Sequence, residues 1–124
     1  MIRIIIADDH DIIRSCFIAL FENIPDCKII AQAADGEEVV ALARELKPDV
    51  ILMDYKMPEL NGVEATKQIK SENPEIKIIG LSMHTADFYI KEFLEAGADT
   101  YLLKDSGIAE IQRTIREIYE NSRV

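Results

Sequence analysis

Residues 4 to 10 read IIIADDH, an apolar run that ends in two adjacent aspartates. Three consecutive isoleucines favour a strand that is buried on both faces, as parallel strands between helices are. Side chains alternate along a strand, so Asp8 and Asp9 do not simply form one solvated face. Neighbouring carboxylates repel each other unless a cation or a hydrogen-bond donor offsets their charge. The stretch therefore predicts a buried strand whose end requires positive charge.

Short β-branched runs alternate with amphipathic stretches along the rest of the chain. Strands are predicted at residues 2–7, 28–34, 49–53, 76–82 and 99–104. The intervening segments have helical periodicity, and the first carries an apolar stripe made of Ile13, Cys16, Phe17, Leu20, Phe21 and Ile24. DGEE at 35–38 and NGVE at 61–64 are typical helix starts. Five strand–helix units predict one α/β domain, with helices on both faces of a parallel sheet.

Composition narrows the classes of function. The chain has 124 residues and a formal net charge of −9. An acidic domain repels phosphate backbones, which argues against non-specific nucleic-acid binding and favours a metal cation or a basic partner. Cys16 and Cys27 have no histidine at a metal-ligand spacing, which favours reduced thiols in a cytosolic protein. Arg3 and Asp8 interrupt the N-terminal apolar run, so we expect neither a signal peptide nor a membrane span, and a cytoplasmic location.

The ends of the predicted strands carry the candidate chemistry. Ligands of open parallel sheets bind beyond the carboxyl ends of the strands. Those ends hold Asp8 and Asp9, then Asp54, Ser82 and Lys104. Carboxylate oxygens suit Mg²⁺, and an ionised carboxylate can attack phosphorus to give an aspartyl phosphate. An ammonium and a hydroxyl could neutralise and bind the phosphoryl oxygens.

These motifs resemble the receiver domain of bacterial response regulators, the family of the chemotaxis protein CheY. The matching features are DD at 8–9, D-x-K-M-P-x-x-x-G from Asp54 to Gly62, LS at 81–82 and the lysine after the fifth strand. The segments DDHDIIR, GLSMH and EAGADTYLLKD are similar to those of the LuxR/FixJ (NarL) type. The resemblance covers the whole chain. It implies a doubly wound (βα)5, flavodoxin-like three-layer fold with strand order 2-1-3-4-5.

The resemblance also implies roles for individual residues. Asp54 would be the phosphoacceptor for the histidine of a sensor kinase. Mg²⁺ would be bound directly by Asp9, Asp54 and the backbone carbonyl of Lys56, and through water by Asp8. Lys104 would pair with the phosphoryl oxygens and Ser82 would hydrogen-bond them, after which Tyr101 would turn inward as a switch. The domain would be a switch rather than a turnover enzyme, because Asp54 is both substrate and catalyst.

Some positions keep more than one interpretation. Asp105 stands where many relatives have proline after the lysine, which leaves the isomer of the Lys104–Asp105 peptide open. Lys56 and His84 lie where relatives tune the phosphoryl lifetime, although a loop residue is the simpler interpretation of His84. His10 is expected to contact the first helix rather than a metal. Phe88 is a candidate partner or dimer contact, because it shares a helical face with charged residues.

Competing functions fail on specific residues. A haloacid-dehalogenase-type phosphatase needs a second aspartate two residues after the nucleophile, and that position is Lys56. A flavodoxin-like flavin carrier needs a Ser/Thr/Gly-rich phosphate loop, and the acidic ADDHD loop at 7–11 would repel a flavin phosphate. A degenerate receiver with an unmodified Asp54 remains an alternative.

The motifs in this sequence do not show which process the switch controls. LuxR/FixJ-type members usually carry a helix-turn-helix DNA-binding domain, and none fits within residues 1–124. We expect an N-terminal fragment of a transcription regulator, with a stand-alone receiver as the alternative. A homodimer formed on phosphorylation is also expected.

Overall fold

The computed structural model describes residues 1–82 and 87–121, without the side chains of residues 87 and 88. The expectations for His84 and for the Phe88 side chain therefore lie outside the described residues. The strands are β1 (Ile2–Ala7), β2 (Cys27–Ala33), β3 (Val50–Asp54), β4 (Lys77–Ser82) and β5 (Thr100–Leu103). The helices are α1 (Asp11–Phe21), α2 (Gly36–Leu46), α3 (Gly62–Glu72), α4 (Asp87–Ala96) and α5 (Ile108–Asn121). None of these helices has the length and apolar character that crossing a membrane requires.

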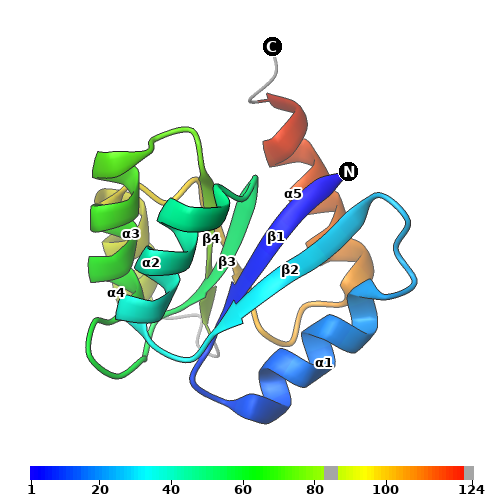
Figure 1. The fold of residues 1–124 in the computed structure, drawn as a ribbon, viewed down its shortest axis with the longest axis horizontal. Coiled ribbons are helices and arrows are strands. Elements are labelled where there is room, and N and C mark those ends of the chain that lie inside the picture. Colours follow the sequence, from blue (N-terminus) through cyan, green and yellow to red (C-terminus); the bar gives the residue numbers. More distant parts are fainter. Residues whose placement is uncertain (83–86, 122–124) are drawn as a thin grey trace.

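The strands form one parallel sheet in the order β2-β1-β3-β4-β5, which confirms the predicted α/β class and topology. Helices α1 and α5 cover one face of the sheet, and α2, α3 and α4 cover the other (Figure 1). The order reverses between β1 and β3, where connections leave to opposite faces. The carboxyl ends of these two strands therefore flank the crevice in which such sheets bind ligands.

Strand β1 shows why the isoleucine run forms a central strand. Ile4 and Ile6 pack into the cluster that α1 and α5 share with the sheet, while Ile5 and Ala7 pack into the cluster on the other face. All four side chains are completely buried. A strand buried on both faces has no solvated side to fill with polar residues, so the first polar residue comes where the strand ends.

The helix starts follow the predicted capping. Asp35 accepts a hydrogen bond from the Glu38 backbone N–H at 2.7 Å and caps α2. The Glu38 carboxylate reaches back to the Ala34 N–H rather than to the cap residue. Asn61 and Glu64 form the complete reciprocal capping box at the start of α3. Both caps fix the point at which the chain leaves the carboxyl edge of the sheet.

The predicted apolar stripe of α1 is partly wrong. Phe17 and Phe21 are buried as expected, but Cys16 is exposed and Leu20 keeps 46% of its surface in solvent. The inward position that an aliphatic side chain would normally fill is taken by Arg14, which is 9% exposed. The buried stripe is therefore narrower than the apolar sequence pattern suggests.

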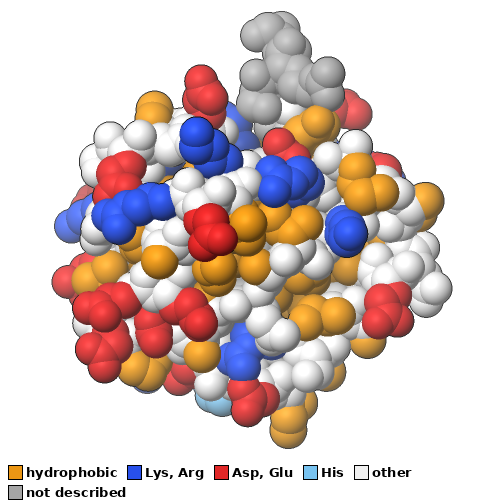
Figure 2. Space-filling view, viewed as in Figure 1, with side chains coloured by type: hydrophobic (Ala, Val, Ile, Leu, Met, Phe, Trp, Pro, Cys, Tyr) orange, Lys and Arg blue, Asp and Glu red, His pale blue; other side chains and the backbone are white. Residues whose placement is uncertain are grey.

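The charged side chains on the face shown in Figure 2 are unevenly distributed. In Figure 2, acidic side chains gather at the lower left, and most lysines and arginines lie in the upper half. Glu37 and Glu38 lie in the first turn of α2, where carboxylates interact favourably with the helix dipole. Hydrophobic side chains lie near the middle of the same view (Figure 2). Part of this apolar surface is expected from β2, an edge strand with half-buried Ile29, Ile30 and Ala31.

Candidate functional site

The predicted strand-end residues meet at one edge of the sheet. Asp8 directly follows β1, Asp54 and Ser82 are the last residues of β3 and β4, and Lys104 directly follows β5. The Lys104 Nζ lies 2.7 Å from the Asp8 Oδ2 and 2.9 Å from the Asp54 Oδ1. Residues almost a hundred positions apart are joined because parallel strands end together.

Lys104 is a buried cation shared by two buried carboxylates. Its side chain is 6% exposed, and Asp8 and Asp54 are 0% and 5% exposed. One ammonium cannot balance two aspartates, and Asp9 adds a third carboxylate at the rim. The site therefore carries excess negative charge in a poorly solvated place, where charge imbalance is costly.

The pKa values reflect this imbalance. Burial raises the pKa of Asp54 from its ordinary value of 3.8 to about 6; the negative charge of Asp8 adds to the rise and the Lys104 ammonium opposes it. Burial also acts to raise the pKa of Asp8, but hydrogen bonds from Lys104 and His10 outweigh it and the pKa falls. Burial acts to lower the pKa of Lys104, yet its bonds to both aspartates raise it. Lys104 stays charged, Asp8 ionises readily, and Asp54 resists ionisation.

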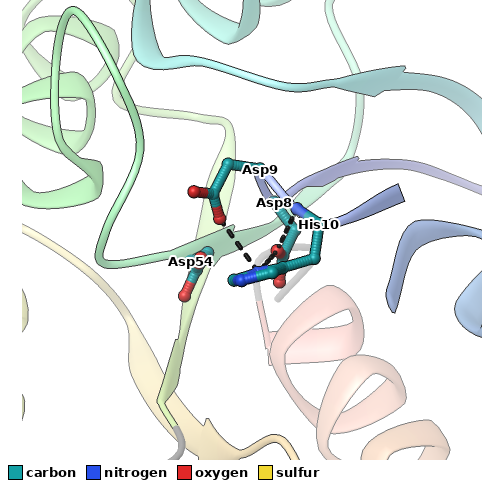
Figure 3. Close-up of side chains that lie close together, drawn as sticks. All are labelled: Asp8, Asp9, His10 and Asp54. Atoms are coloured by element: carbon teal, nitrogen blue, oxygen red, sulfur yellow. Dashed lines mark hydrogen bonds and ion pairs between the residues drawn. The ribbon is translucent and has the colours of Figure 1, made fainter. Parts of the chain in front are cut away.

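The expected contact of His10 with the first helix is confirmed, because His10 is the N-cap residue of α1, and its ring in addition lies at the site. Its Nδ1 lies 2.9 Å from the Asp8 Oδ1 and 3.0 Å from the Asp9 Oδ1, between the two carboxylates (Figure 3). Its backbone carbonyl accepts the Arg14 N–H at 3.1 Å, and its side chain makes no capping hydrogen bond. The hydrogen bond to Asp8 and the charge of Asp9 raise the pKa of His10. Its place directly after the acidic pair was the available sequence signal.

Arg14 is a second residue that sequence reasoning missed. Its Nη1 donates to the Asp8 backbone carbonyl at 2.5 Å, and its Nε donates to the Gln32 Oε1 at 2.8 Å. Its Nη2 contacts the Asp11 carboxylate. The guanidinium thereby ties the loop after β1 to the neighbouring β2. A helical stripe of apolar residues gives no signal for such a buried arginine.

The acidic residues fit a hard divalent cation. Asp8, Asp9, His10 and Asp54 each offer a ligand atom, and these atoms lie within 4.8 Å of one another. The completely buried Asp8 Oδ2 contacts the Lys104 Nζ at 2.7 Å, and the same ammonium is shared with Asp54. Carboxylate oxygens with excess negative charge are the ligands that Mg²⁺ prefers.

A pocket of about 100 Å³ opens beside these groups. It is lined by Asp54, Lys104, Ser82, Lys56, His10, Tyr55 and Tyr89. Ser82 is 7% exposed. The predicted switch residue Tyr101 is half-buried in β5, opposite Gly80. The Lys104–Asp105 peptide, whose isomer the sequence left open, is trans.

The start of α3 touches the end of β3, and glycine makes this possible. The Gly62 N–H donates to the Tyr55 carbonyl at 2.8 Å. A Cβ on Gly62 would lie 1.9 Å from the Asp54 carbonyl oxygen, well inside any tolerable contact. The glycine of the D-x-K-M-P-x-x-x-G pattern thus sets how closely the helix approaches the aspartate.

Comparison with known proteins agrees with this geometry. The family model for the response regulator receiver domain matches residues 4–116. The chain is 48% identical over 116 residues to the transcriptional regulatory protein LiaR of Bacillus subtilis, covering 94% of this chain and 55% of LiaR. It spans little more than half the length of the curated relatives that it matches.

Solved structures show the same fold. A LuxR-family two-component response regulator from Aurantimonas sp. superposes with a TM-score of 0.90 at 35% identity, covering 96% of this chain and 85% of that one. The receiver domain of the sensor histidine kinase PA1611 from Pseudomonas aeruginosa, solved with magnesium coordinated in its active site cleft, superposes with a TM-score of 0.86 at 27% identity, covering 95% and 97%. The chain therefore belongs to the response regulator receiver domain family of two-component signalling.

Proposed function

We propose that Asp54 is the phosphoacceptor of this receiver domain and that a sensor histidine kinase supplies the phosphoryl group. The observation that carries the proposal is the position of the Asp54 carboxylate. It is nearly buried, 2.9 Å from the Lys104 ammonium, and lines a pocket that Ser82 also lines. A carboxylate in that place can attack phosphorus, with a cation and a hydroxyl donor beside the oxygens that must be neutralised.

In the proposed transfer, a carboxylate oxygen of Asp54 forms a bond to phosphorus as the phosphorus–nitrogen bond of the kinase phosphohistidine breaks. The imidazole leaves, and an acyl phosphate remains on Asp54. Lys104 gives up its contact with the Asp54 oxygen and pairs with a phosphoryl oxygen. Ser82 donates its hydroxyl to another phosphoryl oxygen. These two side chains convert a chemical event at β3 into movement at β4 and β5.

A divalent cation completes the proposed site. Asp9, Asp54 and the Lys56 backbone carbonyl would bind Mg²⁺ directly, and Asp8 would bind it through water. When bound, Mg²⁺ supplies positive charge next to the transferred phosphoryl group. The excess of three carboxylates over one ammonium is the feature of this chain that favours the cation.

The proposed output is a change in population between two packings of the domain, with Tyr101 as the second switch residue. The domain acts as a switch rather than as a turnover enzyme. Homodimerisation and a DNA-binding domain outside this chain would carry the output to transcription. The similarity to a longer transcriptional regulatory protein supports this part of the proposal. A cytoplasmic location is consistent with the two free thiols, Cys16 and Cys27.

The test is intact-mass spectrometry after incubation with acetyl phosphate and Mg²⁺. A single phosphoryl adduct is expected in the unchanged protein and in Asp105→Asn, which alters an exposed aspartate next to Lys104. No adduct is expected in Asp54→Asn or in the presence of EDTA. An adduct that persists in Asp54→Asn would assign the acceptor elsewhere. Absence of both the adduct and Mg²⁺ binding would identify a degenerate receiver.

A further inference from the structure

Two tyrosines form an aromatic wall beside Asp54. Tyr55 directly follows the aspartate at the end of β3, and Tyr89 comes from α4. Their rings pack edge to face, with centroids 4.6 Å apart and planes at 75°. Both side chains line the pocket that contains the Asp54 carboxylate. Tyr89 is remote from the phosphorylation motif in sequence, and no step of the proposed transfer uses it.

Tyr55 makes further contacts with two other residues of α4. The Tyr55 hydroxyl donates to the Glu92 Oε2 at 2.9 Å. Burial and this hydrogen bond raise the pKa of Tyr55, so the hydroxyl remains a neutral donor at physiological pH. The Tyr55 ring also packs edge to face on Phe93, with centroids 6.0 Å apart.

The Phe93 ring, on which Tyr55 packs, is itself held in the core. It is 1% exposed. Its ring fills the space over Gly80 of β4, where a Cβ would lie 2.7 Å from the ring. Phe93 is therefore held between the helix and the sheet. The Tyr55 side chain, bonded to Glu92 and packed on Phe93, has little freedom to leave the pocket.

We propose that the Tyr89 ring, held in place by Tyr55 and Glu92, shields a phosphoryl group on Asp54 from water and so lengthens the phosphorylated state. This inference rests on the proposed function and adds a determinant of its lifetime. The pocket, about 100 Å³ in volume, is lined by Asp54 and by both tyrosines, so a phosphoryl group on Asp54 would occupy space that the two rings border.

The reaction that the wall would slow is hydrolysis of the acyl phosphate. The oxygen of a water molecule attacks phosphorus in line as the phosphorus–oxygen bond to the Asp54 carboxylate breaks. The carboxylate is regenerated, inorganic phosphate departs, and a proton passes to solvent. An apolar ring near the line of attack reduces the number of water molecules that reach the reactive geometry. Tyr89 is thus a positioning residue that controls access and does not contact the bond that breaks.

The experiment follows decay of the phosphoryl adduct by intact mass after the donor is removed. Tyr89→Ala removes the ring and should raise the decay rate constant at least about threefold. Tyr89→Phe keeps the ring, so its phosphoryl adduct should have the same lifetime as that of the unchanged protein. Tyr55→Phe removes only the hydroxyl that bonds to Glu92 and should give an intermediate rate. Leu94→Ala alters a side chain of α4 that is 46% exposed, and serves as the control.

The outcomes separate the two proposals. Equal decay rates in all four variants and the unchanged protein would overturn the shielding role and leave the proposed function intact. Equally fast decay in Tyr89→Phe and Tyr89→Ala would also overturn it, because the ring would then have no part. Failure of the unchanged protein to form any adduct would defeat the proposed function, and the shielding inference with it.

Discussion

Replacement of Asp54 by asparagine should make the metal-free protein more stable at neutral pH. Asp54 is 5% exposed and its pKa is raised from 3.8 to about 6, mainly by burial. The folded state therefore binds the Asp54 proton more tightly than the unfolded state does. Above pH 6 the group is ionised in both states, and the folded state bears the cost of a poorly solvated charge. Asparagine has nearly the same shape and removes that charge.

The magnitude follows from the two pKa values. Each tenfold difference in proton affinity corresponds to about 1.36 kcal/mol, so the rise from 3.8 to about 6 corresponds to about 3 kcal/mol. The asparagine oxygen can still accept the Tyr55 N–H, which is 2.9 Å from the Asp54 Oδ1. Its bond with the Lys104 ammonium is weaker, because charge-assisted hydrogen bonds are the stronger kind. We expect a net gain of about 1 to 3 kcal/mol in the free energy of unfolding.

The assay is urea unfolding followed by circular dichroism between pH 4 and pH 8 in EDTA. The Asp54 contribution to stability is complete below pH 3.8, where both states are protonated, and is lost as the pH rises through about 6. The stability difference between Asp54→Asn and the unchanged protein should therefore be largest at pH 8 and smallest at pH 4. Repeating the series with Mg²⁺ should reduce the difference, because ligand binding stabilises the protein that retains the aspartate.

Two results would contradict a destabilising role for the buried Asp54 charge. Lower stability of Asp54→Asn at pH 8 in EDTA would mean that Lys104 fully compensates the buried charge. A stability difference that is constant with pH would mean that ionisation of Asp54 is not its cause.

Three further predictions concern other parts of the domain. Gly62→Ala should cost more than about 2 kcal/mol in urea unfolding, because its Cβ would meet the last carbonyl of β3 at 1.9 Å. Gly107→Ala is the control: its Cβ meets nothing within 4 Å, so the free energy of unfolding should change by less than about 0.5 kcal/mol. Equal losses of stability in the two variants would mean that the close approach of α3 to β3 is not the reason for the glycine at position 62. Arg14→Met should lower the free energy of unfolding by about 2 to 4 kcal/mol, because the loop after β1 loses the arginine that bonds it to β2. The same variant should bind Mg²⁺ more weakly in a calorimetric titration. Unchanged Mg²⁺ affinity would restrict Arg14 to a role in folding. Burial raises the pKa of Cys27 to about 11, so a thiol reagent at pH 8 should modify the exposed Cys16 in the native protein and Cys27 only after unfolding. Rapid modification of both thiols would show that the strand opens locally.

Most of the fold could be predicted because local and tertiary preferences agree. The predicted strand at residues 2–7 has the observed bounds, and those at 28–34 and 49–53 differ from β2 and β3 by one residue at each end. The stripe of α1 was less predictable, since several apolar residues of the pattern remain in solvent and Arg14 is buried. A hydrophobic pattern shows which side chains can be buried, but the neighbouring elements decide which of them are covered.

The order of apolar runs and amphipathic segments specifies the alternation of strands and helices, and therefore that residues at the carboxyl ends of parallel strands share one edge. That rule alone places Asp8, Asp54, Ser82 and Lys104 at the same edge of the sheet. The distribution of the charges depends on tertiary packing: Lys104 is shared by two buried aspartates, Asp9 stays at the rim, and the His10 ring lies against the acidic pair. Sequence pattern cannot give this distribution, because burial and distances of a few ångströms set the pKa and the partner of each charge, and both depend on how the strand ends pack.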